Sequence, residues 1–139
     1  MYHNLSMSDN GSILASSIKE GTAIAVSDGS YKHLHGTAAW VIEGSSRESK
    51  ISGIVITPGG DRDQSAYRSE LAGLLAIFTM VKHNEQQFHL FSGSLQISCD
   101  GGSVLDIIFF RSVFTVDTLS YDIITTIRSM LAGSPFLWD

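Results

Sequence analysis

The segment Ala23–Ser30, which reads Ala-Ile-Ala-Val-Ser-Asp-Gly-Ser, constrains the fold more than any other part of this chain. Small and β-branched apolar residues lead to Asp28, and Gly29 allows the chain to turn sharply beside the carboxylate. This pattern predicts a central strand that ends on an acid. Because an unpaired charge in a buried strand is costly, we expect a cation shared with other acids. Glu70 and Asp100 are the candidates.

The bulk composition limits the class of protein. A chain of 139 residues that is 43% hydrophobic can form one domain with a substantial core, but not two of ordinary size. The formal charge of −5 argues against a broadly basic nucleic-acid-binding surface, so a polyanionic substrate would be held locally or through metal ions. A single cysteine, Cys99, excludes an internal disulfide and argues against a zinc–thiolate cluster.

The sequence contains no apolar run long enough to span a membrane and no signal-peptide pattern at its start. We therefore expect an intracellular protein, cytoplasmic or nuclear, or a piece of one, without membrane association. Residues 1–20 show no sustained periodicity and are expected to form a disordered tail or linker before a domain spanning 21–139.

Strand and helix patterns follow one another from residue 23 onward. Three β-prone runs, 23–28, 37–42 and 51–57, are separated by short turn signals and predict an antiparallel meander. Apolar residues then recur at helical spacing over 65–81, with Ser65 or Asp63 available as the N-cap. Glu70 borders the apolar stripe of this helix, so its side chain can project toward the sheet.

The second half of the chain alternates between the two element types. It predicts a polar loop over 83–94, a strand over 95–100, a short helix over 103–110, an amphipathic helix from Thr118 or Ser120 to about 132, and the start of a fifth strand at 136–138. A right-handed crossover through the long helix places strand 95–100 parallel to strand 23–28. The prediction is an α/β fold with a mixed five-stranded sheet, in which Asp28 and Asp100 end neighbouring strands near Glu70.

Three converging carboxylates repel one another unless they share a cation. An all-oxygen ligand set suits Mg²⁺ or Mn²⁺ rather than zinc. Such a site favours phosphodiester chemistry, in which one ion activates water and a second stabilises the leaving oxygen.

At these residues the chain resembles the ribonuclease H type 1 family, particularly the domains attached to retroelement reverse transcriptases. The resemblance is carried by three motifs in order: Ser27-Asp28-Gly29-Ser30, Tyr67-Arg68-Ser69-Glu70-Leu71-Ala72 and Cys99-Asp100-Gly101. It covers residues 21–139 and implies a ribonuclease H-like fold. It also implies an endonuclease that cuts the RNA strand of RNA–DNA hybrids with two divalent ions, Mg²⁺ or Mn²⁺. A polymerase domain attached in a longer parent protein is a further implied partner.

The same resemblance implies that Asp28, Glu70 and Asp100 are catalytic metal ligands. Candidate substrate contacts are Gly29, Ser30 and Arg68. The chain lacks a counterpart to the family's fourth acid, which lies on a helix after the fifth strand, and ends near the start of that strand. We therefore expect a domain lacking its C-terminal helix.

The positions where the family carries side-chain amides hold Ala66, Tyr67 and Gly102. With these departures and the missing fourth acid, we expect an incomplete site with slow or absent turnover.

Two other functions fit the same pattern. One is a non-catalytic structural or interaction module that keeps the fold. The other is a different nuclease or an integrase on this framework, in which Asp122 rather than Glu70 would be the last acid. Asp106 and Asp122 are otherwise expected on solvated helix surfaces.

Other side chains have plainer interpretations. His33 and His35 are expected in an exposed turn, Cys99 as a small buried residue, and Trp40 and Trp138 in the core. Lys32 and Arg62 are most simply solvated cations, with phosphate contact the less favoured alternative.

Overall fold

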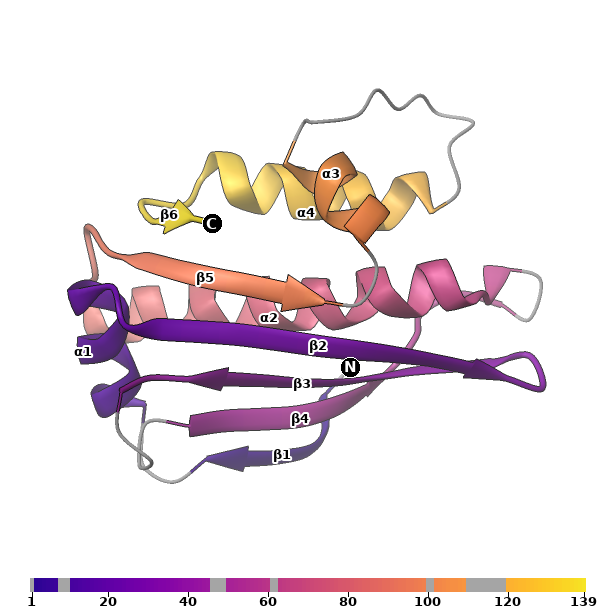
Figure 1. Cartoon of the computed structure of the whole chain (residues 1–139), viewed down its shortest axis with the longest axis horizontal. Coiled ribbons are helices and arrows are strands. Elements are labelled where there is room, and N and C mark those ends of the chain that lie inside the picture. Colours follow the sequence, from indigo (N-terminus) through magenta and orange to yellow (C-terminus); the bar gives the residue numbers. More distant parts are fainter. Residues whose placement is uncertain (1, 8–10, 46–49, 61–62, 100–101, 110–119) are drawn as a thin grey trace.

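The computed structural model describes residues 2–7, 11–45, 50–60, 63–99, 102–109 and 120–139. Within these ranges a single mixed sheet organises the chain (Figure 1). Its strands are β1 (Tyr2–Met7), β2 (Ala23–Lys32), β3 (His35–Glu43), β4 (Lys50–Ile56), β5 (Ser94–Cys99) and β6 (Leu137–Trp138).

The strands lie in the order β1-β4-β3-β2-β5-β6. The pairs β1–β4, β4–β3 and β3–β2 are antiparallel, whereas β2–β5 and β5–β6 are parallel. The predicted meander, the parallel crossover and all five predicted strands are therefore confirmed, and β1 adds a sixth strand at one edge.

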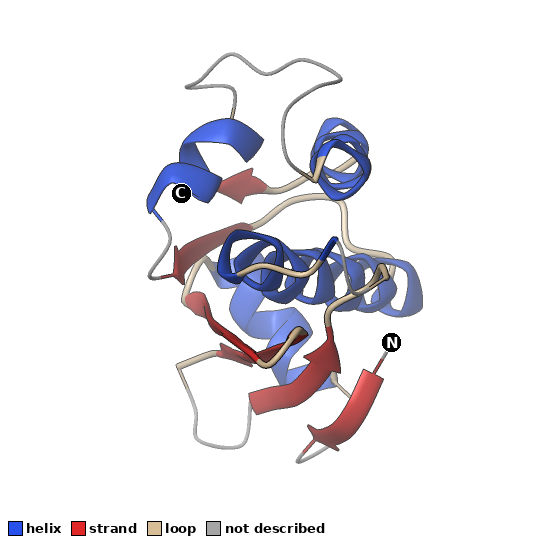
Figure 2. Ribbon diagram, turned by 90° about the vertical axis from the view of Figure 1, so that its right-hand side faces the viewer, coloured by secondary structure: helices blue, strands red, loops and turns tan. Residues whose placement is uncertain are grey.

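Four helices are described: α1 (Ser12–Glu20), α2 (Ala66–Phe88), α3 (Gly102–Ile108) and α4 (Tyr121–Ala132). The longest, α2, packs across β2 and β3, and α4 packs along α2. Figure 2 shows α2 on one side of the central strands, with the other side of β2–β4 uncovered by the described helices. Among the described residues, no helix has the length and apolar character needed to cross a bilayer.

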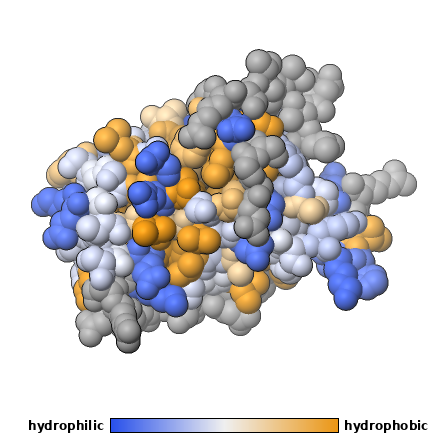
Figure 3. Space-filling model, viewed as in Figure 1, coloured by the Kyte–Doolittle hydropathy of each residue, from blue (hydrophilic) through white to orange (hydrophobic). Residues whose placement is uncertain are grey.

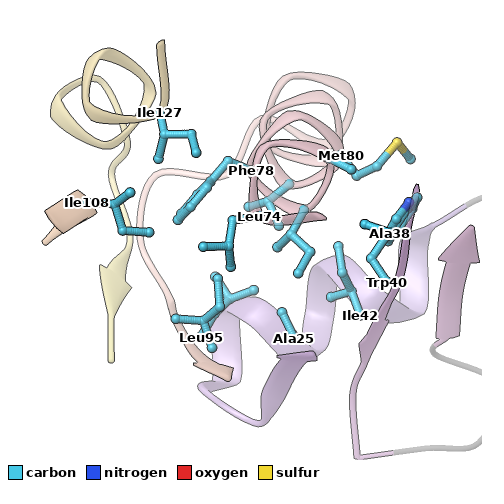
Figure 4. Close-up of a cluster of buried hydrophobic side chains, with 14 of the residues drawn as sticks. Ala25, Ala38, Trp40, Ile42, Leu74, Phe78, Met80, Leu95, Ile108 and Ile127 are labelled. Carbon is cyan, nitrogen blue, oxygen red and sulfur yellow. The ribbon is translucent and has the colours of Figure 1, made fainter. Parts of the chain in front are cut away.

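The core lies between the sheet and α2. Along β2, Ala23, Ala25 and Ser27 are buried toward the helix, whereas the intervening residues are exposed on the opposite face. Leu74 and Phe78 of α2 project into this layer, where Figure 4 shows them among side chains from the sheet and α4. The alternation in β2 follows from the two-residue period of a strand.

The expectation of a disordered tail over residues 1–20 is wrong for the described part of that segment. β1 pairs with β4, and α1 buries Leu14 and Ile18, which are spaced four residues apart on one helix face. Gly21 then ends α1 in the left-handed conformation that favours glycine. The apolar residues of α1 are the consecutive Ile13, Leu14 and Ala15 followed by Ile18, a segment too short to show a sustained helical period in the sequence.

The predicted loop over 83–94 is also wrong in part, because α2 continues to Phe88. Asn84 is buried and donates a hydrogen bond to the carbonyl of Gly11, 3.0 Å away, which ties this last part of α2 to the start of α1. Asn84, which the sequence places in a loop, thus makes a buried contact between α2 and the start of α1.

Candidate active site

Asp28 lies on the uncovered face of the sheet. It alternates with the buried residues Ala25 and Ser27, so its carboxylate is exposed on the side away from α2. β2 does not end at this acid, as the sequence predicted, but continues to Lys32. It continues because His33 and Leu34 both adopt positive φ, 52° and 65°, and close a two-residue hairpin with β3.

Gly29 allows α2 to approach β2 very closely. A Cβ atom at this position would lie 2.7 Å from the backbone nitrogen of Glu70 and 2.8 Å from the carbonyl carbon of Ser69. The Gly29 backbone N–H donates to Glu70 Oε1 over 3.1 Å. This hydrogen bond holds the Glu70 carboxylate against Gly29, the residue that follows Asp28 in β2. Two of the three predicted ligands are therefore associated with neighbouring residues of this strand.

Gly73 makes a second close approach one helical turn further along α2. A Cβ there would meet Ser27 Cβ at 2.9 Å and Ala38 Cβ at 3.1 Å. The motifs in the sequence do not single out Gly73, although a glycine inside a strongly helical pattern is a signal of tight packing. Gly29 and Gly73 together bring the helix backbone down onto β2 where Glu70 is needed.

A polar cluster holds the start of α2 in place. Ser65, one of the two predicted candidates, is the N-cap and accepts a hydrogen bond from the backbone N–H of Arg68 at 3.0 Å. The buried hydroxyl of Thr57 donates to Ser69 Oγ over 3.1 Å, and Gln64 bridges the backbone of Gly36 and Thr57. These bonds link the first turn of α2 to the ends of β3 and β4, and so position Glu70.

Arg68, a predicted substrate contact, has a structural role in this fold. Its side chain is buried and donates to both carboxylate oxygens of Asp122, at 2.8 and 2.7 Å, and to the carbonyl of Pro58 at 2.6 Å. The hydrogen bond that Arg68 donates to Asp122 raises the pKa of Arg68, and the same bond lowers the pKa of Asp122. This arrangement commits the guanidinium to α4 rather than to a phosphate.

The same ion pair bears on the alternative in which Asp122 is the last metal ligand. The Asp122 side chain is 66% exposed, which agrees with the predicted surface position, but both of its oxygens accept from Arg68. A metal ion there would have to displace the buried guanidinium. Glu70, by contrast, is held against Gly29 by a single hydrogen bond to Oε1.

Asp100 lies outside the described residues, as do Arg62 and Gly101. The described part of β5 ends at Cys99, which pairs with Ser27 in the parallel register. Among the described residues, no group of three His, Cys, Asp or Glu side chains is placed to hold a metal ion. The structure thus describes two acids of the predicted three, and their oxygen atoms are the donor type that Mg²⁺ and Mn²⁺ prefer.

The remaining singled-out residues have clear positions. Ser30, His33 and His35 are exposed on the β2–β3 hairpin. Cys99 is partly buried against the core. The Trp40 side chain is buried, as predicted, and Trp138 packs on Phe78 with ring centroids 4.5 Å apart.

Tyr67 occupies one of the positions where the resemblance calls for an amide. Its hydroxyl oxygen is buried, and burial raises the pKa of this group. It therefore does not present an amide-like polar group to solvent.

Comparison with known proteins identifies the fold. No family model matches the chain, and no curated protein matches its sequence. The ribonuclease H1 of the halophilic archaeon Halobacterium salinarum NRC-1 superposes with a TM-score of 0.58 at 14% identity, over 84% of this chain and 81% of that one. The fold is of the ribonuclease H type.

A second solved structure supports the same fold. LC11 ribonuclease H1, determined in complex with an RNA/DNA hybrid, superposes with a TM-score of 0.61 at 10% identity over 84% of this chain and 83% of that one. At this level of identity the likeness concerns the arrangement of strands and helices. The predicted ribonuclease H-like architecture, with a mixed sheet and flanking helices, is therefore confirmed.

Proposed function

We propose that this domain is a divalent-metal-dependent endonuclease that hydrolyses the RNA strand of RNA–DNA hybrids. The observation that carries the proposal is the hydrogen bond from the backbone N–H of Gly29, the residue that directly follows the exposed Asp28, to Glu70 Oε1. The third ligand in the proposal is Asp100, on the motif that follows β5. The ribonuclease H-type fold adds support, since one neighbour of this fold was determined with an RNA/DNA hybrid.

The chain's own residues have distinct roles in this proposal. Asp28, Glu70 and Asp100 would hold Mg²⁺ or Mn²⁺, and two bound ions would supply an activated water and charge stabilisation at the scissile phosphate. Gly29 orients Glu70 through its backbone N–H, and the exposed hydroxyl of Ser30 lies two positions beyond Asp28. Because the sequence departs from the family at its amide positions, which hold Ala66, Tyr67 and Gly102, we expect slow turnover.

The biological setting in this proposal is an intracellular retroelement reverse transcriptase, with a polymerase domain attached in a longer parent protein. The support for this setting is the sequence of the three motifs around Asp28, Glu70 and Asp100. Selectivity for hybrids would rest on 2′-hydroxyl contacts and duplex shape rather than on base sequence.

Metal binding tests the proposal separately from turnover. Adding Mg²⁺ or Mn²⁺ to the wild-type protein is expected to raise its melting temperature, because a ligand that binds only the folded state stabilises it. The effect should be lost in Asp28→Asn and in Glu70→Gln, and kept in Glu20→Gln, which removes an exposed acid at the end of α1. Equal metal-dependent stabilisation in all four proteins would contradict the proposal, and no stabilisation in any of them would favour a non-catalytic module.

A further inference from the structure

The open face of the sheet is divided at Asp28. Toward the start of β2 it is apolar, with Ile24 46% and Val26 40% exposed, and on β4 the exposed Ile54 lies level with Asp28. Figure 3, which views this face, shows hydrophobic residues gathered over the central strands. Beyond Asp28, toward the hairpin that joins β2 and β3, the residues of these two strands that face the open side of the sheet are polar.

The polar half is a two-stranded ladder of hydrogen-bond donors. The strand register pairs Asp28 with Ala39, Ser30 with Thr37, and Lys32 with His35. Alternate residues of a strand share a face, so Ser30, Lys32, His35 and Thr37 lie on the same side as Asp28. We call these four residues the hairpin ladder. All four are exposed, and within the described ranges none of their side chains makes a hydrogen bond or ion pair.

The hairpin is also locally free of negative charge. The whole chain has a formal charge of −5, yet residues 29–42 contain no Asp or Glu and carry Lys32, His33 and His35 within four positions. The hairpin extends past the end of β4 in Figure 1, which leaves it open to a large ligand. The hairpin thus carries Lys32, His33 and His35 with no carboxylate between Gly29 and Ile42.

A groove of about 330 Å³ lies beside the hairpin, in the corner where β4 ends. Its walls combine the aliphatic side chains of Leu34 and Ile56 with the polar side chains of His35, Thr37 and Gln64. Both aliphatic residues are more than half exposed. Apolar walls with polar edges suit the sugar and base of a nucleotide as well as its phosphate.

We propose that the hairpin ladder binds the phosphate backbone of the nucleic acid whose scissile phosphate lies at Asp28. This inference rests on the proposed nuclease function and adds the surface that holds the substrate. At a strand rise of about 3.3 Å per residue, Lys32 lies about 13 Å from Asp28, within reach of a phosphate a few nucleotides away. Lysine, imidazole and hydroxyl donors are the groups that typically contact phosphate oxygens. The ladder explains how an acidic protein can hold a polyanion.

Salt-dependent binding of a labelled RNA–DNA hybrid tests the proposal. All proteins carry Asp28→Asn to prevent cleavage, and are compared with and without the double substitution Lys32→Ala/His35→Ala. The matched control is Lys82→Ala/His83→Ala, which removes the same pair of residue types from the exposed surface of α2. Thermal unfolding checks that each variant is folded, which is expected because the substituted side chains are all exposed.

The ladder substitution is expected to weaken binding about tenfold at moderate salt, whereas the control should leave it unchanged. The slope of log affinity against log salt should also fall by about one for each phosphate that the protein no longer neutralises. Hybrid binding that is equal in all three proteins would overturn the ladder and leave the nuclease proposal standing. Absence of hybrid binding in the parent protein would overturn the nuclease proposal itself, and the ladder with it.

Discussion

The ion pair between Arg68 and Asp122 joins the first turn of α2 to the first turn of α4, and its loss should destabilise the fold. Replacing Asp122 with asparagine breaks a bidentate pair with N–O distances of 2.8 and 2.7 Å. Exposed ion pairs contribute about 0.2–1 kcal/mol, whereas breaking a buried pair costs about 3–5 kcal/mol. Here one side chain is 6% exposed and the other 66%, so we expect a loss of about 2 kcal/mol.

A double-mutant cycle in urea isolates the pair. Asp122→Asn also removes a negative charge from the first turn of α4, which contributes about 0.3–1 kcal/mol through the helix dipole. Combining it with Arg68→Met subtracts that contribution and leaves the coupling energy. Glu20→Gln serves as the control for loss of an exposed charge and should change the free energy of unfolding by less than about 0.5 kcal/mol.

The stability that the ion pair contributes should depend on pH with a definite sign. The hydrogen bond from Arg68 lowers the pKa of Asp122 in the folded state, so the ion pair's contribution to folding stability is fully present above the ordinary aspartate pKa of about 4. It is lost as the pH falls through the lowered folded-state value. The difference in stability between wild type and Asp122→Asn should therefore shrink in acid. A coupling energy below about 0.3 kcal/mol at pH 7, or a difference that does not change with pH, would refute the assignment.

Two further stability predictions use matched pairs. Gly29→Ala places a methyl group against the backbone of Glu70 and should lower the free energy of unfolding, measured in urea, by about 1–3 kcal/mol. Gly133→Ala, whose Cβ would meet nothing closer than 3.8 Å, should lower it less. Equal effects would contradict the close packing of α2 on β2. Leu74→Ala, in the fully buried core, should lower the free energy of unfolding by about 2–5 kcal/mol. Leu137→Ala, at a residue that is 77% exposed, should leave it nearly unchanged. A loss below about 1 kcal/mol at Leu74 would contradict its place in the core.

Much of the architecture is readable from the sequence because its signals are local. The apolar run before Asp28, the helical spacing after Ser65 and the turn signals between strands each depend on a few neighbouring residues. The order of the elements then allows few topologies, since parallel crossovers are right-handed. These rules suffice to predict that Glu70 lies close to the part of β2 that carries Asp28.

The errors concern contacts between residues distant in the sequence. Arg68 reads as a surface cation because Asp122, which fixes it, is 54 residues away. Asn84 reads as a loop residue because its partner, Gly11, is 73 residues away. The apolar residues before residue 21 show no sustained period in the sequence, yet β4 offers an unpaired edge for a strand and α2 and β5 offer surface for α1. Tertiary context decides such positions.

Cleavage of an end-labelled RNA–DNA hybrid most directly tests the central claim that Asp28, Glu70 and Asp100 form a nuclease site. Wild type and Asp28→Asn are incubated with Mg²⁺ and then with Mn²⁺, beside a DNA duplex of the same sequence. We predict slow, metal-dependent cutting of the RNA strand only, absent from Asp28→Asn. Equal cutting by both proteins, or no cutting by wild type with either metal, would contradict the account.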